Sequence, residues 1–245
     1  MERRRNMIKL YEKLQQTLRD KVAEHNLGKE KLSVHCRDLS AEEAIGNPDD
    51  MDYPIIKGKE RMVEAVFAGA RGQAFSDEYG NREYQVDDLL KLPLDSNRNR
   101  ADFIASFNAV FRYLELCDHT IHCRDQEPPQ CAAEALKKIG SGRKVLLVGL
   151  QPRFLEFISR ENEVRVVDLD AENIGCKKFG VLIEPVENTD AAIQWCDLIF
   201  ATGSTFVNAT VGNFIDRGRP LLLYGVSAAA PARVLGLDTF CFCGH

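Results

Sequence analysis

The stretch Lys144–Phe157, KVLLVGLQPRFLEF, decides the fold class of the chain. Residues 144–150 form a short run rich in Val and Leu, and a helix-compatible segment follows at 153–160. Similar apolar runs recur at 164–169, 180–183, 198–201 and 220–224, with further helix-compatible segments at 187–195 and 205–217. Continuous apolar strands that alternate with helices are typical of a parallel sheet covered on both faces. This pattern predicts a Rossmann-like domain over residues 143–245.

The residues before this domain follow a different pattern. Apolar side chains recur at helical spacing through residues 6–26, which predicts an amphipathic helix. A short strand at 31–36, a capping box formed by Ser40 and Glu43, and helices at 101–116 and 130–138 follow. We therefore expect an α/β chain with an N-terminal helix in residues 1–30 and an α+β domain over 31–142.

Composition narrows the possible partners and compartments. The chain of 245 residues carries a formal net charge of -5, which gives no electrostatic case for binding nucleic acid or an anionic membrane. No segment approaches the roughly 20 apolar residues that a membrane span requires. Nothing directs export, so a cytoplasmic location is expected, with most of the eight cysteines reduced.

Two turns at the ends of predicted strands are candidate ligand sites. The first turn carries a single glycine, Gly149, where a dinucleotide-binding fingerprint needs three. Asp168 ends the next predicted strand, where a ribose-binding acid would lie, but without the three glycines it is weak evidence for a dinucleotide site. The second turn, Thr202–Thr205, offers hydroxyls and amides where a strand leads into a predicted helix, and helix N-termini bind anions. Ser204 or Thr205 could equally be a simple N-cap of that helix.

A cluster of metal-binding side chain types lies between the two predicted domains. The segment 117–131, CDHTIHCRDQEPPQC, contains thiols and imidazoles, the ligands that soft and borderline metals prefer. Cys131 is expected in the first helical turn after Pro128 and Pro129, where the helix dipole lowers the pKa of a thiol. The alternative is that these cysteines are buried packing residues. No C-x2-C pair is present, so a structural zinc site is disfavoured.

Two further sequence features bear on this cluster. The tetrapeptide His-Cys-Arg-Asp occurs at 35–38 and at 122–125, but only the second copy has another cysteine within a few residues. The C-terminal CFCGH resembles a small chelator, yet Cys241 and Cys243 are expected to complete the inward face of a last strand.

Several stretches together resemble the heavy-metal-chelation family of uncharacterised domains. In the second half they are KVLLVGLQPRF, CDLIFATGSTFVNAT and LLLYGVSAAAPARVLG. In the first half they are EAIGNP, KGKE, GQAFSD, RADFIASFNAV and TIHCRDQEPPQCA. The resemblance implies a domain like the enolase N-terminal domain, a Rossmann-like domain, and a ligand cleft between the two. It also implies chemistry on, or chelation of, a transition metal or a metal-containing cofactor.

The resemblance and the residue chemistry together yield three sets of candidate site residues. Candidate catalytic residues are Lys57, Glu60, Asp77 and Arg100. Candidate ligand-binding residues are Gln73, Asn108, Gly149, Thr202, Gly203, Ser204, Thr205 and Asn208. Candidate metal ligands are His122, Cys123 and Cys131.

Three functions remain open from the sequence. The first is binding of a transition metal ion, or of a small anionic metal-complexing ligand, in the interdomain cleft, with the Thr202–Thr205 turn holding a carboxylate or phosphate. The second is a metal-independent transferase or lyase that acts on a small anionic substrate through Lys57, Glu60, Asp77 or Arg100. The third is a non-catalytic binding or assembly module, with the N-terminal helix packing on a second subunit in a homodimer.

Overall fold

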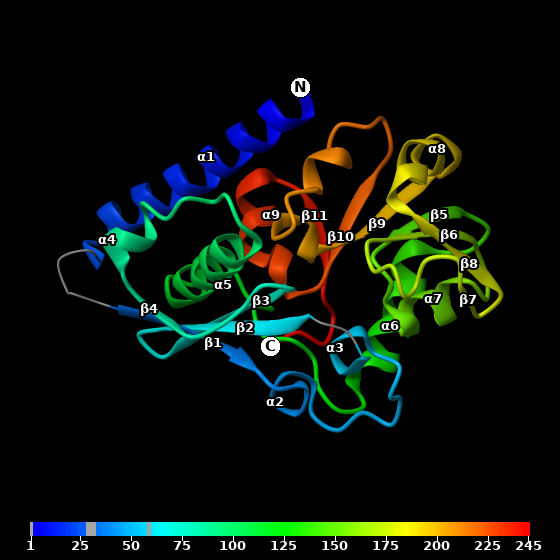
Figure 1. The fold of residues 1–245 in the computed structure, drawn as a ribbon, viewed down its shortest axis with the longest axis horizontal. Coiled ribbons are helices and arrows are strands. Elements are labelled where there is room, and N and C mark those ends of the chain that lie inside the picture. The colour runs from blue at the N-terminus through cyan, green and yellow to red at the C-terminus, as the bar shows by residue number, and fades with distance from the viewer. Residues whose placement is uncertain (1, 28–32, 58–59) are drawn as a thin grey trace.

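The computed structural model describes residues 2–27, 33–57 and 60–245, and contains two sheets (Figure 1). The smaller sheet has the order β3-β2-β1-β4 and is antiparallel. Its strands are β1 (Ser33–Leu39), β2 (Arg61–Phe67), β3 (Ala70–Ser76) and β4 (Arg82–Gln85). The helices of this part are α2 (Ala41–Ile45), α3 (Pro54–Lys57), α4 (Val86–Leu89) and α5 (Asn97–Tyr113).

The larger sheet has the order β11-β10-β9-β5-β6-β8-β7. Its strands are β5 (Lys144–Val148), β6 (Glu163–Asp168), β7 (Lys177–Lys178), β8 (Val181–Pro185), β9 (Leu198–Thr202), β10 (Leu221–Tyr224) and β11 (Asp238–Phe240). All pairs are parallel except β7 with β8. When β7 is left out and β5 is counted as strand 1, the sheet has the strand order 3-2-1-4-5-6 of doubly wound sheets. The chain adds strands first on the β6 side of β5 and then on its β9 side, so the order of addition reverses between β5 and β9. Ligands of such sheets bind at the carboxyl ends of the strands beside this reversal.

Alternating side chains of the parallel strands serve two different cores. Val145 and Leu147 of β5 belong to the cluster that includes α6 (Glu127–Ile139) and α7 (Pro152–Ile158). Leu146 and Val148 belong to the cluster that contains α8 (Thr189–Trp195), α9 (Ala229–Leu235) and residues of the smaller sheet. Because α6 packs with the larger sheet, we propose that the second structural unit begins with α6 and not at residue 143.

The N-terminal helix α1 (Glu2–Glu24) packs along the other elements of its own chain (Figure 1). Leu14 and Leu18 are fully buried in the same core as Phe103 of α5. The Tyr11 hydroxyl donates a 2.5 Å hydrogen bond to the backbone oxygen of Phe206. The apolar face that the sequence offered for a second subunit is therefore covered within the chain, which corrects the idea that this face forms a dimer.

A buried amide joins the two parts of the molecule. Asn108 of α5 has no exposed surface. Its Nδ2 donates to the backbone oxygens of Gln73 and Val226, both at 3.0 Å, and its Oδ1 accepts from the Ala230 amide at 2.9 Å. Buried polar groups are costly to leave unpaired, so these three bonds set the position of α5 between the smaller sheet and α9.

The segment predicted as a helix at 205–217 is not an α-helix. It contains two short 3-10 turns, Gly203–Phe206 and Val211–Asn213. The Asn208 side chain bonds the Thr210 hydroxyl and amide, and such local bonds compete with the helical ladder. Part of the strand predicted at 31–36 falls on residues 31 and 32, which lie outside the described residues; from Ser33 onward it is β1. No helix in the described ranges is long and apolar enough to span a membrane.

A first prediction concerns the contact between β3 and α5. A Cβ atom at Gly72 would lie 2.3 Å from the Ala109 nitrogen and 2.4 Å from the Ala105 oxygen, which are backbone atoms. We expect Gly72→Ala to lower the free energy of unfolding by about 2 kcal/mol or more, measured by urea denaturation.

Gly212→Ala is the matched control for this prediction. Its new Cβ would meet only the Met7 side chain, whose sulfur lies 2.7 Å away and can move. A loss of stability from Gly72→Ala no larger than that of the control would contradict the proposed close contact.

Candidate functional site

A cleft of about 1070 Å³ lies between the two sheets. The smaller sheet contributes residues at its edge, including Phe75 and Asp77 near the end of β3. The larger sheet contributes the carboxyl ends of its strands, including Gly149 after β5, Asp168 of β6 and Thr202 of β9. The cleft therefore occupies the place where the order of the parallel strands reverses.

Most of the candidate residues line this cleft. They are Glu60, Asp77, His122, Cys123, Cys131, Gly149, Thr202, Gly203, Ser204, Thr205 and Asn208. Lys57 ends α3, but its side chain lies outside the part of the structure that is described. Gln73, Arg100 and Asn108 are not among the lining residues.

The three candidates outside the lining have other bonding partners. The Arg100 guanidinium donates to the backbone oxygens of Val207 and Leu94 and to the Asn97 side chain. Gln73 donates to Glu64 through Nε2 and accepts from the His122 amide at 2.8 Å through Oε1. The polar groups of Arg100 and Gln73, like those of Asn108, thus form hydrogen bonds to other parts of the protein. These side chains connect and position segments around the cleft.

The turn after β5 is closed by side chains of the larger sheet. Gly149 has φ +82°, and Thr202 would lie 2.8 Å from a Cβ at this position. The Leu150 amide donates to Asp168 Oδ2, and the Tyr224 hydroxyl donates to the Gly149 oxygen at 2.8 Å. Because the Leu150 amide is occupied and carboxylates lie beside it, this turn lacks the free donors of a phosphate-binding loop.

The Thr202–Thr205 turn is bonded internally as well. The Ser204 amide donates to Thr202 Oγ1, and the Thr205 hydroxyl donates to the Thr202 oxygen at 2.7 Å. A 3-10 turn of four residues follows in place of the predicted helix, so no helix dipole points at the cleft here. The helix N-terminus on which the predicted anion site relied is therefore not formed at this turn, and the capping side chain is Thr202 rather than Ser204 or Thr205.

The described lining is strongly acidic. It contains seven carboxylates and no lysine or arginine among the described residues: Glu60, Asp77, Asp168, Asp170, Glu172, Glu187 and Asp190. Arg217 pairs with Asp190 at 2.8 Å, whereas Asp168 accepts only backbone amides in its hydrogen bonds. A lining of this charge favours a ligand that is cationic or rich in hydrogen-bond donors.

Glu60 has the most altered acidity of these carboxylates. Its side chain reaches solvent in the cleft but is surrounded by protein, and this partial burial raises its pKa. The charges of Asp168, Asp77 and Asp170 raise it further, to a pKa of about 7. Glu60 can therefore change its protonation state near neutral pH.

His122 faces the same cleft in a defined tautomeric state. Its Nδ1 lies 2.6 Å from the Cys123 backbone oxygen, so Nδ1 carries the proton and donates it. Burial lowers the pKa of His122, which favours the neutral imidazole. The Nε2 atom then retains a lone pair, and an imidazole whose other nitrogen donates to a carbonyl is the usual form of a metal ligand.

The neighbouring thiols are protonated rather than activated. Burial raises the pKa of Cys123 to about 12, and burial also raises the pKa of Cys131. The predicted lowering at Cys131 is wrong because α6 begins at Glu127, which puts Cys131 in the second turn, with only 5% of its surface exposed. Among the described residues, no group of three or more His, Cys, Asp or Glu side chains is arranged to hold a metal ion. His122, Cys123 and Cys131 are thus not arranged as a three-donor group in the described part of the chain.

Ion pairs anchor the segment that carries Tyr53 to the larger sheet. Arg153 of α7 pairs with Asp50 at 3.0 Å and with Asp52 at 3.1 Å, and Lys178 of β7 pairs with Asp52 at 2.7 Å. Tyr53 is thereby held in the cleft wall, where its buried hydroxyl has no hydrogen-bond partner among the described residues. An unpaired buried hydroxyl is an unmet bonding capacity that a ligand can satisfy.

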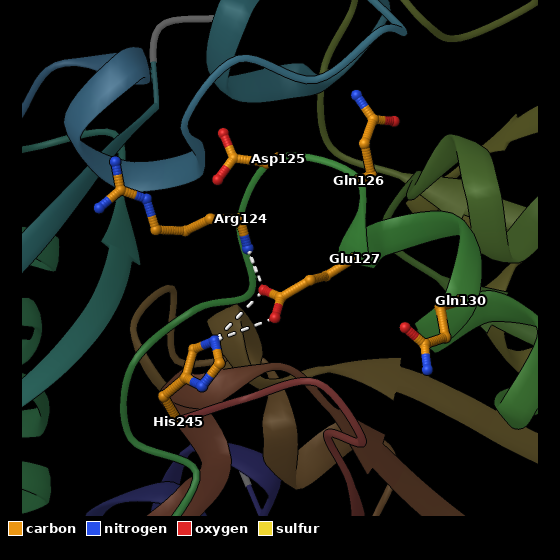
Figure 2. Close-up of a pocket in the computed structure, with 6 residues that line it drawn as sticks. All are labelled: Arg124, Asp125, Gln126, Glu127, Gln130 and His245. Atoms are coloured by element: carbon orange, nitrogen blue, oxygen red, sulfur yellow. Dashed lines mark hydrogen bonds and ion pairs between the residues drawn. The ribbon is translucent and has the colours of Figure 1, made fainter.

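A shallower pocket of about 430 Å³ lies at the start of α6 (Figure 2). Figure 2 shows the Glu127 and His245 side chains pointing toward one another, and their closest atoms are 3.2 Å apart. Glu127 also accepts a 2.6 Å hydrogen bond from the Arg124 amide. These contacts hold the C-terminal segment against the 124–127 turn.

Sequence reasoning missed several residues of the cleft wall. Asp170, Tyr53, Tyr224 and Cys241 line the cleft but were not selected, and Asp168 was considered only as a ribose ligand. Asp170 follows a predicted parallel strand, a position that could have identified it. Cys241 belongs to the CFCGH segment, but it was assigned to the packing of a last strand, because its neighbours in the cleft come from remote parts of the sequence.

Comparison with known proteins supports the resemblance noted from the sequence. Residues 132–236 match the model of the DUF364 family, which is described as "Putative heavy-metal chelation". The match confirms the resemblance. No curated protein shows a significant match.

Two solved structures are similar to this chain at low sequence identity, and the first of them shares its fold. A DUF364 protein of unknown function from Pyrococcus horikoshii superposes with a TM-score of 0.55 at 13% identity, covering 89% of this chain and 80% of its own. A DUF364 protein of unknown function from Desulfitobacterium hafniense has a TM-score of 0.48 at 13% identity, covering 71% and 72%. The first of these extends the structural similarity well beyond the matched residues 132–236.

A second prediction follows from the acidity of Glu60. The pKa of Glu60 is raised in the folded state, so the folded protein loses stability as the pH rises through about 7 and Glu60 ionises. Below the ordinary glutamate pKa the side chain is protonated in both the folded and the unfolded state, and this loss of stability is absent. We expect Glu60→Gln to raise the melting temperature by about 2 °C at about pH 8.5 and to leave it unchanged at about pH 4, a small effect because solvent screens the charge.

Glu163→Gln is the control for this experiment, since Glu163 is exposed at the opposite, amino end of β6. Equal melting curves for Glu60→Gln and the parent at both pH values would contradict the crowding of carboxylates in the cleft.

Proposed function

We propose that this chain binds a small, positively charged metal complex in the cleft between its two sheets. The matched family is described as putative heavy-metal chelation, which agrees with a metal-binding role in general terms. The observation that carries the finer proposal is the size and charge of the cleft together with its donor set.

The size of the cleft favours a complex over a bare ion. A cleft of about 1070 Å³ is in the range of pockets that hold whole small molecules. No described group of three or more protein donors is arranged around a single ion position. A metal that binds here must therefore bring most of its ligands with it, as part of a small molecule that fills the cleft.

The charge of the cleft favours a cationic complex. The carboxylates of Glu60, Asp77 and Asp168 lie near one another, since the charges of Asp77 and Asp168 raise the pKa of Glu60. An anionic ligand would face repulsion from this wall, whereas a cation would be attracted. For this reason the anionic ligand predicted from the sequence is replaced here by a cationic one.

His122 is the side chain best suited to touch the metal of such a complex. Its Nδ1–H bond to the Cys123 oxygen orients the ring and leaves Nε2 as a neutral donor. The ring also packs edge-on against Phe75, with centroids 5.4 Å apart, which restricts its rotation. One fixed imidazole is enough to complete the coordination of a complex that has an exchangeable position.

A third prediction tests this assignment with defined probes. We expect the protein to bind the cationic nickel complex of diethylenetriamine more tightly than the anionic complex of nitrilotriacetate, measured by isothermal titration calorimetry. His122→Ala should weaken binding of the cationic complex by about tenfold or more, because an oriented imidazole donor is lost.

His35→Ala is the matched control, because His35 lies on β1, belongs to the first His-Cys-Arg-Asp copy, and does not line the cleft. Preference for the anionic complex, or equal binding by parent and His122→Ala, would rule out the proposed function.

One observation favours a second candidate, an enzyme that uses Glu60 for acid–base chemistry. A carboxyl group with a pKa of about 7 can both accept and donate a proton at neutral pH, as a general acid–base catalyst requires. Asp77 is nearby, but Arg100 is committed to backbone oxygens and cannot assist. A turnover whose pH profile shows no ionisation near 7, or survives Glu60→Gln, would exclude this candidate.

A further inference from the structure

Two apolar side chains are exposed at the ends of neighbouring strands of the larger sheet. Leu169 directly follows β6, and Val186 directly follows β8. The last residues of these strands, Asp168 and Pro185, are paired with one another, so Leu169 and Val186 come next to each other at the sheet edge. Leu169 is 55% exposed and Val186 is 37% exposed, and both line the cleft. They provide a surface on which an apolar part of a ligand can pack.

The carboxylate beside this surface is oriented by the backbone. Asp168 accepts a 2.5 Å hydrogen bond from the Leu150 amide through Oδ2 and a 2.7 Å hydrogen bond from the Asp170 amide through Oδ1. A carboxylate has about four lone-pair sites, so each oxygen retains acceptor capacity after one amide bond. Asp168 lines the cleft and therefore offers two fixed acceptor oxygens to a ligand that carries neighbouring hydroxyl groups.

A second carboxylate lies on the other side of the apolar pair in the chain. Glu187 follows Val186, is exposed, and lines the cleft. Carboxylate oxygens accept hydrogen bonds from groups such as an exocyclic amino group of a base. Asp168, Leu169, Val186 and Glu187, here called the strand-end wall, thus combine an apolar strip with an acceptor next to each of its two side chains.

The same end of the sheet is unsuited to a phosphate group. The Leu150 amide is bonded to Asp168, the Phe154 amide is bonded to Gln151 Oε1 at 2.6 Å, and Pro152 has no N–H. The described lining of the cleft also contains no lysine or arginine. Since phosphates bind to free N–H groups and cationic side chains, a ligand of the strand-end wall carries no phosphate.

We propose that the strand-end wall binds a nucleoside of the adenosine class whose 5′ substituent is uncharged or cationic. The ribose hydroxyls donate to Asp168, as they do to an acid at the end of the second strand in doubly wound sheets. The purine packs on Leu169 and Val186, and its amino group donates to Glu187. Such a ligand is rich in hydrogen-bond donors, which matches the acidic lining.

This inference goes beyond the proposed function. It concerns a second class of ligand, contains no metal, and does not use His122. The nucleoside contacts come from the carboxyl ends of β6 and β8, whereas the imidazole comes from the segment before α6.

The first test titrates the full chain with nucleosides by isothermal titration calorimetry. We expect adenosine to bind with a dissociation constant below about 1 mM, and 5′-amino-5′-deoxyadenosine to bind at least as tightly. Removal of both ribose hydroxyls in 2′,3′-dideoxyadenosine, or addition of a phosphate in adenosine 5′-monophosphate, should weaken binding by about tenfold or more. Inosine, which lacks the amino group, should bind about fivefold more weakly.

The second test uses variants of the strand-end wall. Asp168→Asn should weaken adenosine binding by about tenfold but leave binding of 2′,3′-dideoxyadenosine unchanged, because only adenosine has the ribose hydroxyls. Its matched control is Asp197→Asn, since Asp197 also accepts a backbone amide, that of Lys144, but does not line the cleft.

An apolar variant keeps the test decisive if Asp168→Asn does not fold. Leu169→Ser replaces an exposed side chain and should weaken adenosine binding by about threefold or more. Leu182→Ser is its control, because Leu182 is a similarly exposed leucine on β8 that does not line the cleft. Both control variants should bind adenosine as the parent does.

Three results would overturn the nucleoside site: no adenosine binding by the parent up to about 1 mM, equal binding of adenosine and its 5′-monophosphate, or an unchanged affinity in Leu169→Ser. The parent is titrated separately with the cationic nickel complex. A chain that binds the nickel complex but not adenosine loses only the nucleoside site, and the reverse result overturns only the proposed function.

Discussion

The architecture of this protein depends on the buried amide of Asn108. Three backbone hydrogen bonds from this one side chain join β3, the turn before α9 and the start of α9 around α5. Because each bond is fully shielded from water, the two sheets cannot shift relative to α5 without leaving polar groups unpaired. The cleft between the sheets is the space that this constraint leaves open.

The cleft has two chemically different walls. Carboxylates follow the ends of β3 and β6, and burial together with repulsion from these carboxylates raises the pKa of Glu60. Thiols and the His122 imidazole come from the 119–131 segment and the C-terminal residues. A site with hard, charged oxygens on one side and soft, neutral donors on the other can discriminate between ligands by charge and by softness at once.

Elements with strong periodicity were predictable, and elements that depend on local polar bonds were not. The alternation of apolar runs at 144–224 identified the parallel sheet, because its central strands β5 and β9 are buried on both faces. The helix expected at 205–217 failed because Asn208 and the Thr202–Thr205 hydroxyls bond their own backbone. The same bonds occupy the hydrogen-bond donors that had made this turn a candidate anion site. The wrong prediction of a helix therefore also affected the predicted ligand site.

The sequence by itself determined the fold class, and most of the residues it singled out line the cleft, since strand ends of a parallel sheet meet at one edge whatever the loops do. Only the tertiary structure decided their chemistry. Burial turned Cys131 from an expected thiolate into a protonated thiol, and packing of α1 on its own chain removed a supposed dimer face. Cys131 of α6 and Cys243 after β11 belong to one core cluster, and no spacing rule relates two such positions; long-range packing alone puts them in it.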